Sequence, residues 1–400
     1  MTLPLLEIRD DLRRHGDDLV ALRRDLHRHP ELAFQERRTA EIVAERLHRA
    51  GLEVTTGVAG TGVVGVLRGD RPGRTIAWRA DMDALPLQEA VEGPFQSTTA
   101  DVMHACGHDG HTAIAVVLAE VLGARRAQLP GSTVFLFQPA EETFGGARPM
   151  IETGVLDHHR VAEVYGLHLT SRIPVGRVEA RAGVSMASAD FLEIEVTGSG
   201  GHGAWPHLSV NPIAIAAQIM VGLQQVVMST VPAQRAAVLT IGQMLAGTAP
   251  NIIPERAVLK GSLRTLLADD RSALIERVGA YVQAVAGAHR GRAVMRRLGG
   301  DCPPLVNHDH QTALVCGCAG DELGAGSVEA GEPVMGSDDM SLFLEQRPGC
   351  YFRVGAAPEG RPSRPHHSPS FEIHEGSLAV GARVAASVLL QSLQARSESS

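Results

Sequence analysis

The densest group of residues able to do chemistry is MHACGHDGH at positions 103 to 111, which holds three histidines, a cysteine and an aspartate. Thiolate sulfur and imidazole nitrogen are both good ligands for divalent transition metals. Cys106 and His108 are two residues apart, so in an extended loop their side chains point to the same side. The segment therefore predicts a metal site. The alternative is a polar loop that caps a helix and carries incidental histidines.

A second candidate is QPAEE at 138 to 142, where Glu141 and Glu142 follow an apolar, strand-like segment. The two side chains diverge, so one can bind a metal ion while its neighbour faces the substrate. Adjacent carboxylates repel each other, and a cation relieves that repulsion. The carboxylate that is not a ligand can then accept a proton from a water that the ion has made more acidic. Taken alone, a pair of glutamates is more commonly a solvated surface feature.

Other polar residues stand at the ends of apolar segments. His168 follows VAEVYGL, and His366 and His367 precede SPS in a proline-containing loop. Asp81 and Asp83 come directly after TIAWRA. We expect these two carboxylates to accept hydrogen bonds from the distal nitrogen of a ligating histidine and so to fix its tautomer. A lone histidine is usually structural, but together these residues predict a site of Cys, His and Glu ligands large enough for two ions.

Helical and strand patterns alternate in the part of the chain that carries these residues. This alternation is typical of an α/β sheet, here a mixed sheet flanked by helices. Open α/β sheets bind ligands beyond the carboxyl ends of their strands, where the polar residues stand. The expected helices are at 5–28, 36–50, 112–124 and 147–152, and the expected strands are at 62–67, 75–79, 133–138 and a segment that ends at 167.

A different pattern begins near residue 184. It reads as strand, helix, two strands, helix and strand, which predicts a small two-layer α+β domain. After about residue 298 the first pattern returns, with helices at 311–323, 339–345 and 377–393 and a strand at 350–354. We therefore expect a discontinuous catalytic domain of residues 1–184 and 298–400, with residues 185–297 inserted as a second domain.

Bulk composition excludes several partners. A chain of 400 residues favours two domains. Its formal charge of −8 makes nucleic acid and anionic membrane surfaces unexpected partners, because both call for concentrated Lys and Arg. The N-terminus is charged and lacks the apolar core of a signal peptide, and no later stretch reads as apolar for long enough to span a bilayer. With five cysteines and no disulfide spacing, a cytoplasmic location is expected.

With these segments in hand, the chain resembles the peptidase M20 family over nearly its whole length. The similar subgroup contains hippurate hydrolases, N-acyl-amino-acid amidohydrolases and hydrolases of indole-acetyl amino-acid conjugates. Many motifs in one order are far more specific than any single motif. In order, they are LHRHPELAFQE, WRADMDALP, MHACGHDGHTA, FLFQPAEE, YGLHL, GSGGHGAWPH, GTAPNIIPERAVLKGSLRT, MGSDDMS and HHSPSFEI.

The resemblance implies two divalent metal ions per subunit, zinc or manganese first and nickel or cobalt as alternatives. It implies that Cys106 bridges the ions or lies between them, that His108 and His168 bind one ion, and that Glu142 and His367 bind the other. His367 is preferred to His366 because the family places this ligand directly before the Ser/Asn-Pro step. Other branches of the family usually have a histidine in place of Asp81 and an aspartate in place of Cys106, so the assignment follows the subgroup.

Glu141 becomes the general base in this resemblance, and the inserted domain becomes a lid and dimerisation domain. His202 is implied to reach the active site of the partner subunit and to polarise the scissile carbonyl. Asn251 and Arg264 fall where the family binds the carboxylate of the substrate, which a guanidinium fork suits. By themselves, His202 reads as a polar turn residue and Arg264 as a surface residue. The expected assembly is a homodimer or a tetramer built from two dimers.

The implied reaction is hydrolysis of the amide bond of an N-acyl amino acid, a small molecule, to a carboxylic acid and an amino acid. The chain has no GxSxG elbow to support an acyl-enzyme. Rival specificities are those of a dipeptidase, an aminopeptidase or an amino-sugar deacylase. A metal-dependent binding protein that has lost hydrolytic activity is the rival of another class, and the retained Glu141 beside Glu142 argues against it.

Overall fold

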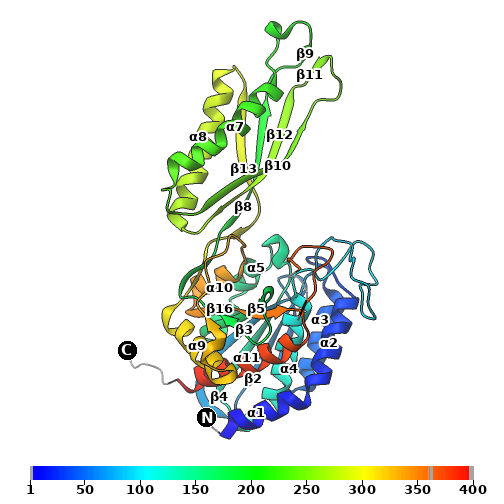
Figure 1. Ribbon diagram of the computed structural model, residues 1–400, viewed down its shortest axis with the longest axis vertical. Helices are drawn as coiled ribbons and strands as arrows, with labels where there is room; N and C mark the ends of the chain where they lie inside the picture. The colour runs from blue at the N-terminus through cyan, green and yellow to red at the C-terminus, as the bar shows by residue number, and fades with distance from the viewer. Residues whose placement is uncertain (1–2, 359, 361–363, 396–400) are drawn as a thin grey trace. The chain divides into compact units, whose positions relative to one another are not determined.

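The computed structural model describes residues 3–358, 360 and 364–395 of the chain (Figure 1). The chain forms two compact units. The first comprises 1–183, 306–332 and 339–400, and the second comprises 184–305 and 333–338. The second unit extends past the boundary expected near residue 298 because its last strand, β13 (Arg292–Cys302), continues beyond that point.

The first unit is built on an eight-stranded mixed sheet. Strands β3, β4, β5 and β16 are parallel neighbours, so their carboxyl ends lie at one edge of the sheet. Strands β1 and β2 add antiparallel neighbours beside β4. In sheet order the strands are β1 (Glu53–Val58), β2 (Gly62–Arg68), β4 (Pro130–Gln138), β3 (Arg71–Asp81), β5 (Val161–Pro174), β16 (Gly349–Ala357), β6 (Val178–Glu179) and β15 (Val328–Glu329).

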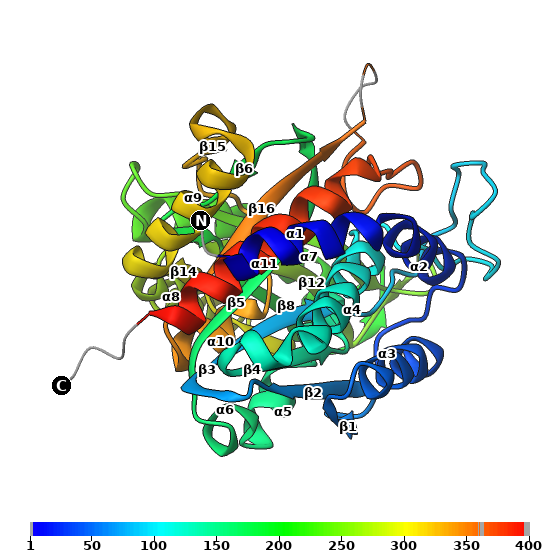
Figure 2. The ribbon, with the colours of Figure 1, turned by 90° about the horizontal axis from the view of Figure 1, so that it is seen from below.

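Helices cover both faces of this sheet, which confirms the predicted fold class. Figure 2 shows α1, α2, α4 and α11 on one side of strands β2, β3 and β4, with α5 and α6 on the other. The helices of this unit are α1 (Leu3–Arg14), α2 (Gly16–Arg28), α3 (Arg37–Arg49), α4 (His108–Ala124), α5 (Ala147–Glu152), α6 (Val155–His158), α9 (Asp309–Leu323), α10 (Met340–Gln346) and α11 (Gly376–Gln394).

Two helices differ from the sequence-based expectation. The helix expected over 5–28 is divided at His15, next to Gly16, a poor helix former. Helix α4 begins at His108, four residues before the expected start at 112. Gly107 makes this early start possible, because its φ of 91° lies in the left-handed region that glycine adopts without strain. The first turn of α4 thus carries residues of the proposed metal site.

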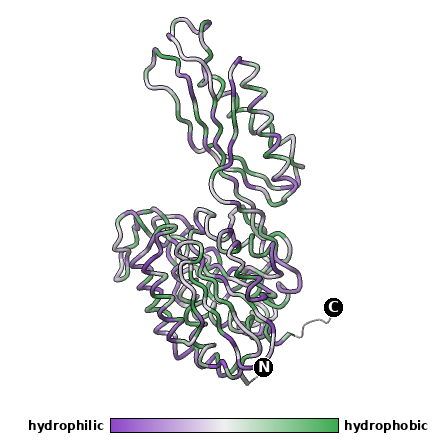
Figure 3. The backbone as a smooth tube through the Cα atoms, turned by 180° about the vertical axis from the view of Figure 1, so that it is seen from behind, coloured by the Kyte–Doolittle hydropathy of each residue, from purple (hydrophilic) through white to green (hydrophobic). Residues whose placement is uncertain are grey.

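The second unit is a four-stranded antiparallel sheet of order β10-β12-β8-β13, packed against two helices. Its core comes from alternate residues of the strands and from one face of each helix, and Figure 3 shows hydrophobic and hydrophilic residues mixed along these strands. Asn211 caps the first helix by accepting a hydrogen bond from the Ile213 amide at 3.0 Å. The elements are β8 (Ala189–Thr197), β9 (Gly201–His202), α7 (Pro212–Thr230), β10 (Ala237–Ala246), β11 (Ile252–Ile253), β12 (Arg256–Thr265), α8 (Ala268–Ala288) and β13, with β7 (Gly183–Met186) and β14 (Leu305–Asn307) where the chain passes between the units.

Helices α7 and α11 are long and apolar enough to cross a membrane by length and composition alone. This corrects the expectation that no stretch of the chain meets that test. In α11, 78% of the apolar stretch is buried, as in the core helix of a layered fold. Only 22% of the stretch in α7 is buried, with Ile215, Ile219 and Leu223 packed into the core of the second unit. The exposed side of α7 carries the apolar residues Met220, Val221 and Met228 among polar ones.

Candidate active site

The polar residues of the first unit gather beyond the carboxyl ends of its parallel strands. Asp81 is the last residue of β3, and Gln138 is the last residue of β4. Strand β5 continues to Pro174 instead of ending at residue 167, but its pairing with β3 stops at Gly166. His168 therefore lies just past the last residue pair of β3 and β5, level with the end of β3, at the edge where open α/β sheets bind ligands.

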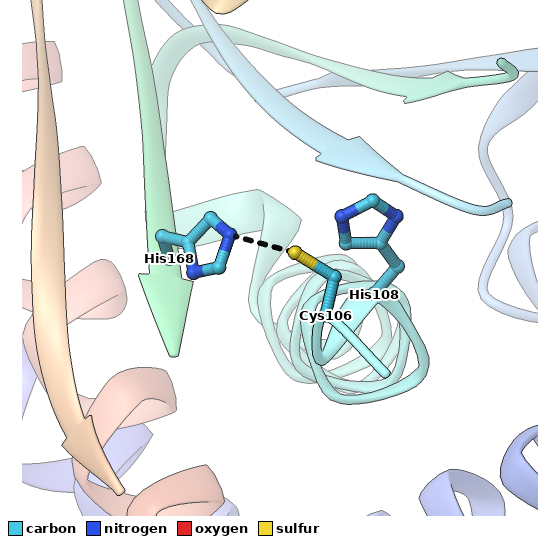
Figure 4. A group of neighbouring side chains, drawn as sticks. All are labelled: Cys106, His108 and His168. Carbon is cyan, nitrogen blue, oxygen red and sulfur yellow. Dashed lines mark hydrogen bonds between the residues drawn. The ribbon is translucent and has the colours of Figure 1, made fainter. Parts of the chain in front are cut away.

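Cys106, His108 and His168 form the first group of potential ligands (Figure 4). The Sγ atom of Cys106 lies 3.5 Å from Nε2 of His168. The other ring nitrogens are occupied, because Nδ1 of His108 donates to the carbonyl oxygen of Asp83 at 2.9 Å and Nδ1 of His168 donates to that of Leu169 at 2.8 Å. In the neutral form of each imidazole the proton is therefore on Nδ1, which leaves the lone pair on Nε2 for a metal ion.

Cys106 also belongs to a second group, with Glu142 and His367. Nε2 of His367 lies 3.2 Å from a carboxylate oxygen of Glu142. The backbone of His367 adopts a left-handed φ of 59°, and its amide donates to the carbonyl oxygen of Ala105 at 2.9 Å. This bond ties the histidine to the loop that carries Cys106. The two groups therefore share one thiol, as expected of a ligand that lies between two ions.

The charges of the site suit cations. Burial raises the pKa of the Cys106 thiol well above its usual value, and Glu142 and Glu141 raise it further. Burial alone would lower the pKa of His108, but the carboxylates of Asp81 and Asp83 outweigh it and raise the pKa to about 10. Such a site favours added positive charge, which divalent ions would supply while keeping the sulfur as a thiolate.

Two buried atoms of the site also indicate that it binds a cation. Nε2 of His108 and one carboxylate oxygen of Glu142 are buried without a hydrogen-bond partner among the described residues. They lie 3.9 Å apart. A buried polar group without a hydrogen bond costs about 1–3 kcal/mol, and a bound ion would satisfy both of these facing atoms. The donor set of sulfur, imidazole and carboxylate fits two divalent ions of the zinc or manganese type.

Glu141 lies beside the ligands on a short 3-10 turn, Glu141–Thr143. Its carboxylate oxygen is 3.9 Å from Nε2 of His108. The backbone amides of Glu141 and Glu142 donate to the two carboxylate oxygens of Asp83, each at 3.0 Å. Asp83 also lies against the distal nitrogen of His108, because its backbone carbonyl accepts from Nδ1 and one of its carboxylate oxygens is 3.3 Å from the same atom. In addition, which the sequence did not indicate, its carboxylate holds the turn that carries the two glutamates.

Asp81 orients a histidine that the sequence analysis did not assign to the site. Its carboxylate accepts from Nδ1 of His111 at 2.7 Å, and Nε2 of His111 accepts from the amide of Leu169 at 2.9 Å. Both ring nitrogens of His111 are therefore used within the protein. Arg79 donates to the other oxygen of Asp81 at 2.6 Å, and the pKa of Asp81 is well below its usual value although burial opposes this. The position of His111 one turn after His108 was the available signal.

The structure also separates the other neighbouring histidines. His366 donates from Nε2 to the carbonyl oxygen of Leu169 at 3.1 Å, and burial lowers its pKa to about 4. His367, in contrast, faces Glu142. His104 is fully buried, which lowers its pKa to about 3, and it lies in none of the ligand groups among the described residues.

The remaining predicted residues belong to the second unit. His202 is exposed on β9, and its Nδ1 accepts from the amide of Ala204 at 3.1 Å, so its proton is on Nε2. Arg264 on β12 donates from Nη1 to the carbonyl oxygen of Met335 and to the hydroxyl of Ser337, both at 3.0 Å. Asn251 is exposed, and its carbonyl oxygen accepts from the amide of Gly203 at 2.9 Å, which links it to the strand of His202.

The sequence profile described as Peptidase family M20/M25/M40 matches residues 77–391. The chain belongs to this family. It is 37% identical over 366 residues to an N-acetylcysteine deacetylase of Bacillus subtilis, with 91% of this chain and 94% of the relative covered. It is 36% identical over 381 residues to the IAA-amino acid hydrolase ILR1-like 2 of Arabidopsis thaliana, covering 94% and 86% of the two chains.

A solved M20 structure has the same architecture. The YXEP protein of Bacillus subtilis, described as a dinuclear metal binding peptidase, has a TM-score of 0.80 and 33% identity, with 96% of this chain and 99% of that chain covered. These matches confirm the predicted family, the fold class and a metal-dependent hydrolase. The family match and the shared-thiol geometry together identify an amidohydrolase with a site for two divalent ions.

Proposed function

We propose that this M20 hydrolase cleaves the amide bond of N-acyl amino acids and releases a carboxylic acid and an amino acid. The observation that carries the proposal is the pair of ligand groups that share Cys106 next to Glu141. His108 and His168 serve one ion, and Glu142 and His367 serve the other. When bound, the two ions would polarise the scissile carbonyl and make a water acidic enough to attack it near neutral pH.

The chain's own residues then move the proton. Glu141 is close to the ligands, 5% exposed, and held on a rigid turn, as a general base should be. We assign it to accept the proton of the attacking water and to return that proton to the leaving amine. Glu142 has the same chemistry, but because it lies near His367 and Cys106 we assign it to metal binding.

The substrate class rests on two supports. Two relatives are named for substrates with an acyl group on an amino acid nitrogen, N-acetylcysteine and IAA-amino acid conjugates. In the second unit, hydrogen bonds to Met335 and Ser337 orient the guanidinium of Arg264, which suits a fork for the substrate carboxylate, with Asn251 as its helper. His202 carries its proton on Nε2, the form that can donate to a developing oxyanion.

We further propose that the protein is a homodimer assembled through its second unit, with His202 acting across subunits. Helix α7 exposes Val221 at 75% and Met228 at 76%. Strand β10 is an edge strand with Met244 and Leu245 exposed. An exposed apolar helix beside an open strand edge is typical of a surface that a second copy covers. We place the enzyme in the cytoplasm, in keeping with its five unpaired cysteines.

Metal analysis and a substrate panel test the reaction. The purified protein should contain two divalent ions per chain and should release the amino acid from N-acetyl, N-benzoyl and longer acyl derivatives. Free-amine dipeptides, tested in parallel, should react far more slowly. Faster cleavage of the dipeptides would make the enzyme a peptidase, and full metal loading with no turnover of any compound would favour a binding protein.

Mixing two inactive variants tests action across subunits. A dimer formed from one His202→Ala chain and one Glu141→Gln chain has one site with both wild-type groups. Partial activity should therefore return after subunit exchange, and neither variant alone should show it. If exchange is verified by mass and activity stays absent, His202 does not act in the partner's site.

A further inference from the structure

The segment HPELAFQE at 29–36 has no part in the site described above, yet it lies against two of the segments that form it. Leu32 forms a parallel bridge with Ala84, and the amide of Ala84 donates to the carbonyl oxygen of Glu31 at 2.8 Å. This contact is one residue from Asp83. The segment therefore runs beside the strand end whose aspartate holds the Glu141 turn.

The segment is itself firmly anchored. The carboxylate of Glu31 accepts from the amides of Arg38 at 3.0 Å and Thr39 at 2.8 Å, at the start of α3. These amides have no partner within the helix, so the carboxylate stabilises the first turn. Glu36, the residue just before α3, is thereby fixed in place between the helix and the sheet edge.

Glu36 reaches the base through one backbone group. Its side chain is fully buried, and one carboxylate oxygen accepts from the amide of Ala140 at 2.9 Å. The other oxygen accepts from the hydroxyl of Thr61. Ala140 directly precedes Glu141, so Glu36 holds the backbone at the point where the chain turns into the catalytic segment.

The turn needs such support. Ala140 has φ 54° and Phe144 has φ 52°, so left-handed residues that are not glycine bracket the turn. Conformations of this kind persist only where surrounding contacts enforce them. The amides of Ala140, Glu141 and Glu142 donate in succession to the carboxylates of Glu36 and Asp83. Two buried carboxylates therefore accept hydrogen bonds from three consecutive backbone amides.

We propose that Glu36 is a positioning residue for the general base. Its carboxylate holds Ala140 in the left-handed conformation and thereby directs the side chain of Glu141 toward the site of reaction. The inference rests on the proposed role of Glu141. Glu36 itself does not touch the substrate or the ions, and it needs only a hydrogen-bond acceptor, not a charge, to do this work.

Three substitutions at Glu36 distinguish the effect of its hydrogen-bond acceptor from the effects of its charge and its volume. Glu36→Met keeps the volume but removes the acceptor, so kcat should fall about 10- to 100-fold, as for other lost supporting contacts, with KM nearly unchanged and both ions retained. Glu36→Gln keeps an oxygen for the Ala140 amide and should recover most of the activity. Glu36→Asp, an alternative if the Met variant does not fold, retracts the acceptor and should be intermediate. A folded Glu36→Gln protein as defective as Glu36→Met or Glu36→Asp would overturn the proposal.

Amide hydrogen exchange gives a readout independent of activity. In the holoenzyme, exchange in a peptide covering residues 138–145 should become faster in Glu36→Met and should stay near wild type in Glu36→Gln. Glu163→Ala is the matched control, because Glu163 is a buried carboxylate of the same sheet outside the site. It should leave kcat and the exchange of this peptide unchanged. Unchanged exchange in a Glu36→Met protein with low kcat would contradict positioning through the backbone.

A double-mutant cycle separates this inference from the role of Glu141. If Glu36 acts through Glu141, adding Glu36→Met to Glu141→Gln should lower kcat by less than threefold beyond Glu141→Gln alone, well inside the range expected of the single change. A full further loss would show that Glu36 acts elsewhere and would overturn the proposal. If Glu141→Gln alone kept wild-type kcat, the base assignment would fail first, whatever the result at Glu36.

Discussion

Two groups of buried ionisable side chains on the sheet of the first unit differ in how many of their atoms have partners. Near the start of β5, Glu163 accepts hydrogen bonds from Arg74 at 2.9 Å, Gln311 at 3.0 Å and Tyr165 at 2.8 Å, and a further one from Ser392. At the carboxyl edge, His108 and Glu142 each keep a buried atom without a partner among the described residues.

This difference distinguishes a group that stabilises the fold, around Glu163, from a group that is built to bind a ligand, at the carboxyl edge. Burial would raise the pKa of the Glu163 carboxyl. The hydrogen bonds from its partners, Ser392 first, and the charge of Arg74 have the larger effect, so this pKa is lowered. That network is complete within the chain. At the other edge, the protein satisfies only the atoms that orient each side chain, such as Nδ1 of His108, and leaves the facing atoms for something else to bind. An incomplete set of partners is expected where ions and substrate complete the site.

The largest effect should come from Glu141→Gln. The amide keeps size and polarity but cannot accept a proton, so kcat should fall about 100- to 10,000-fold while both ions stay bound. Steady-state kinetics with metal analysis measures both. Glu142→Gln is the control, because it should loosen one ion and be partly rescued by excess metal. If Glu141→Gln lost metal and Glu142→Gln kept it without turnover, the two roles would be reversed.

Cys106→Ala should come next. The thiol is common to both ligand groups, so its loss should reduce metal content and activity together. Dialysis against metal-free buffer followed by metal analysis should find fewer than two ions per chain. A variant that still held two ions would show that Cys106 is not a ligand.

Acid should weaken ion binding in a graded way. In the site without ions, Asp81 and Asp83 offset burial and hold the pKa of His108 at about 10, so near neutral pH an ion must displace its proton. Affinity should therefore fall about tenfold per pH unit for each proton displaced as the pH is lowered. Metal titrations between pH 8 and about pH 5 measure this slope. Affinity independent of pH would exclude His108 as a ligand.

The smallest effect on activity should come from Glu163→Ala. The substitution leaves buried donors without an acceptor and should reduce the free energy of unfolding by about 1–3 kcal/mol, with kcat unchanged. Because the pKa of Glu163 is lowered in the folded state, the stability that it contributes is present above its unfolded pKa and is lost as the pH falls through the folded value. Denaturant unfolding at several pH values checks this. A fall in kcat would show that the Glu163 network contributes to catalysis as well as to stability.

The sequence by itself predicted which residue types bind the metal ions and that they lie near one edge of the sheet. Cys106, His108 and Glu142 stand in motifs whose chemistry is local, and alternating helical and strand patterns predict the sheet edge beside them. These features depend on neighbouring residues and on the periodicity of side-chain burial, so a single sequence shows them. The structure brings these side chains within reach of one another.

Tertiary structure alone decided which polar groups pair. Sheet order places Ala140 beside Glu36 and the Glu141 turn beside Asp83, segments separated by up to 104 positions in the chain. It also turns His367 toward Glu142 and His366 toward a backbone carbonyl, although the two are adjacent in sequence. Whether a hydrogen bond forms depends on differences of a few tenths of an ångström in the separation of packed segments, and neither composition nor periodicity contains that information.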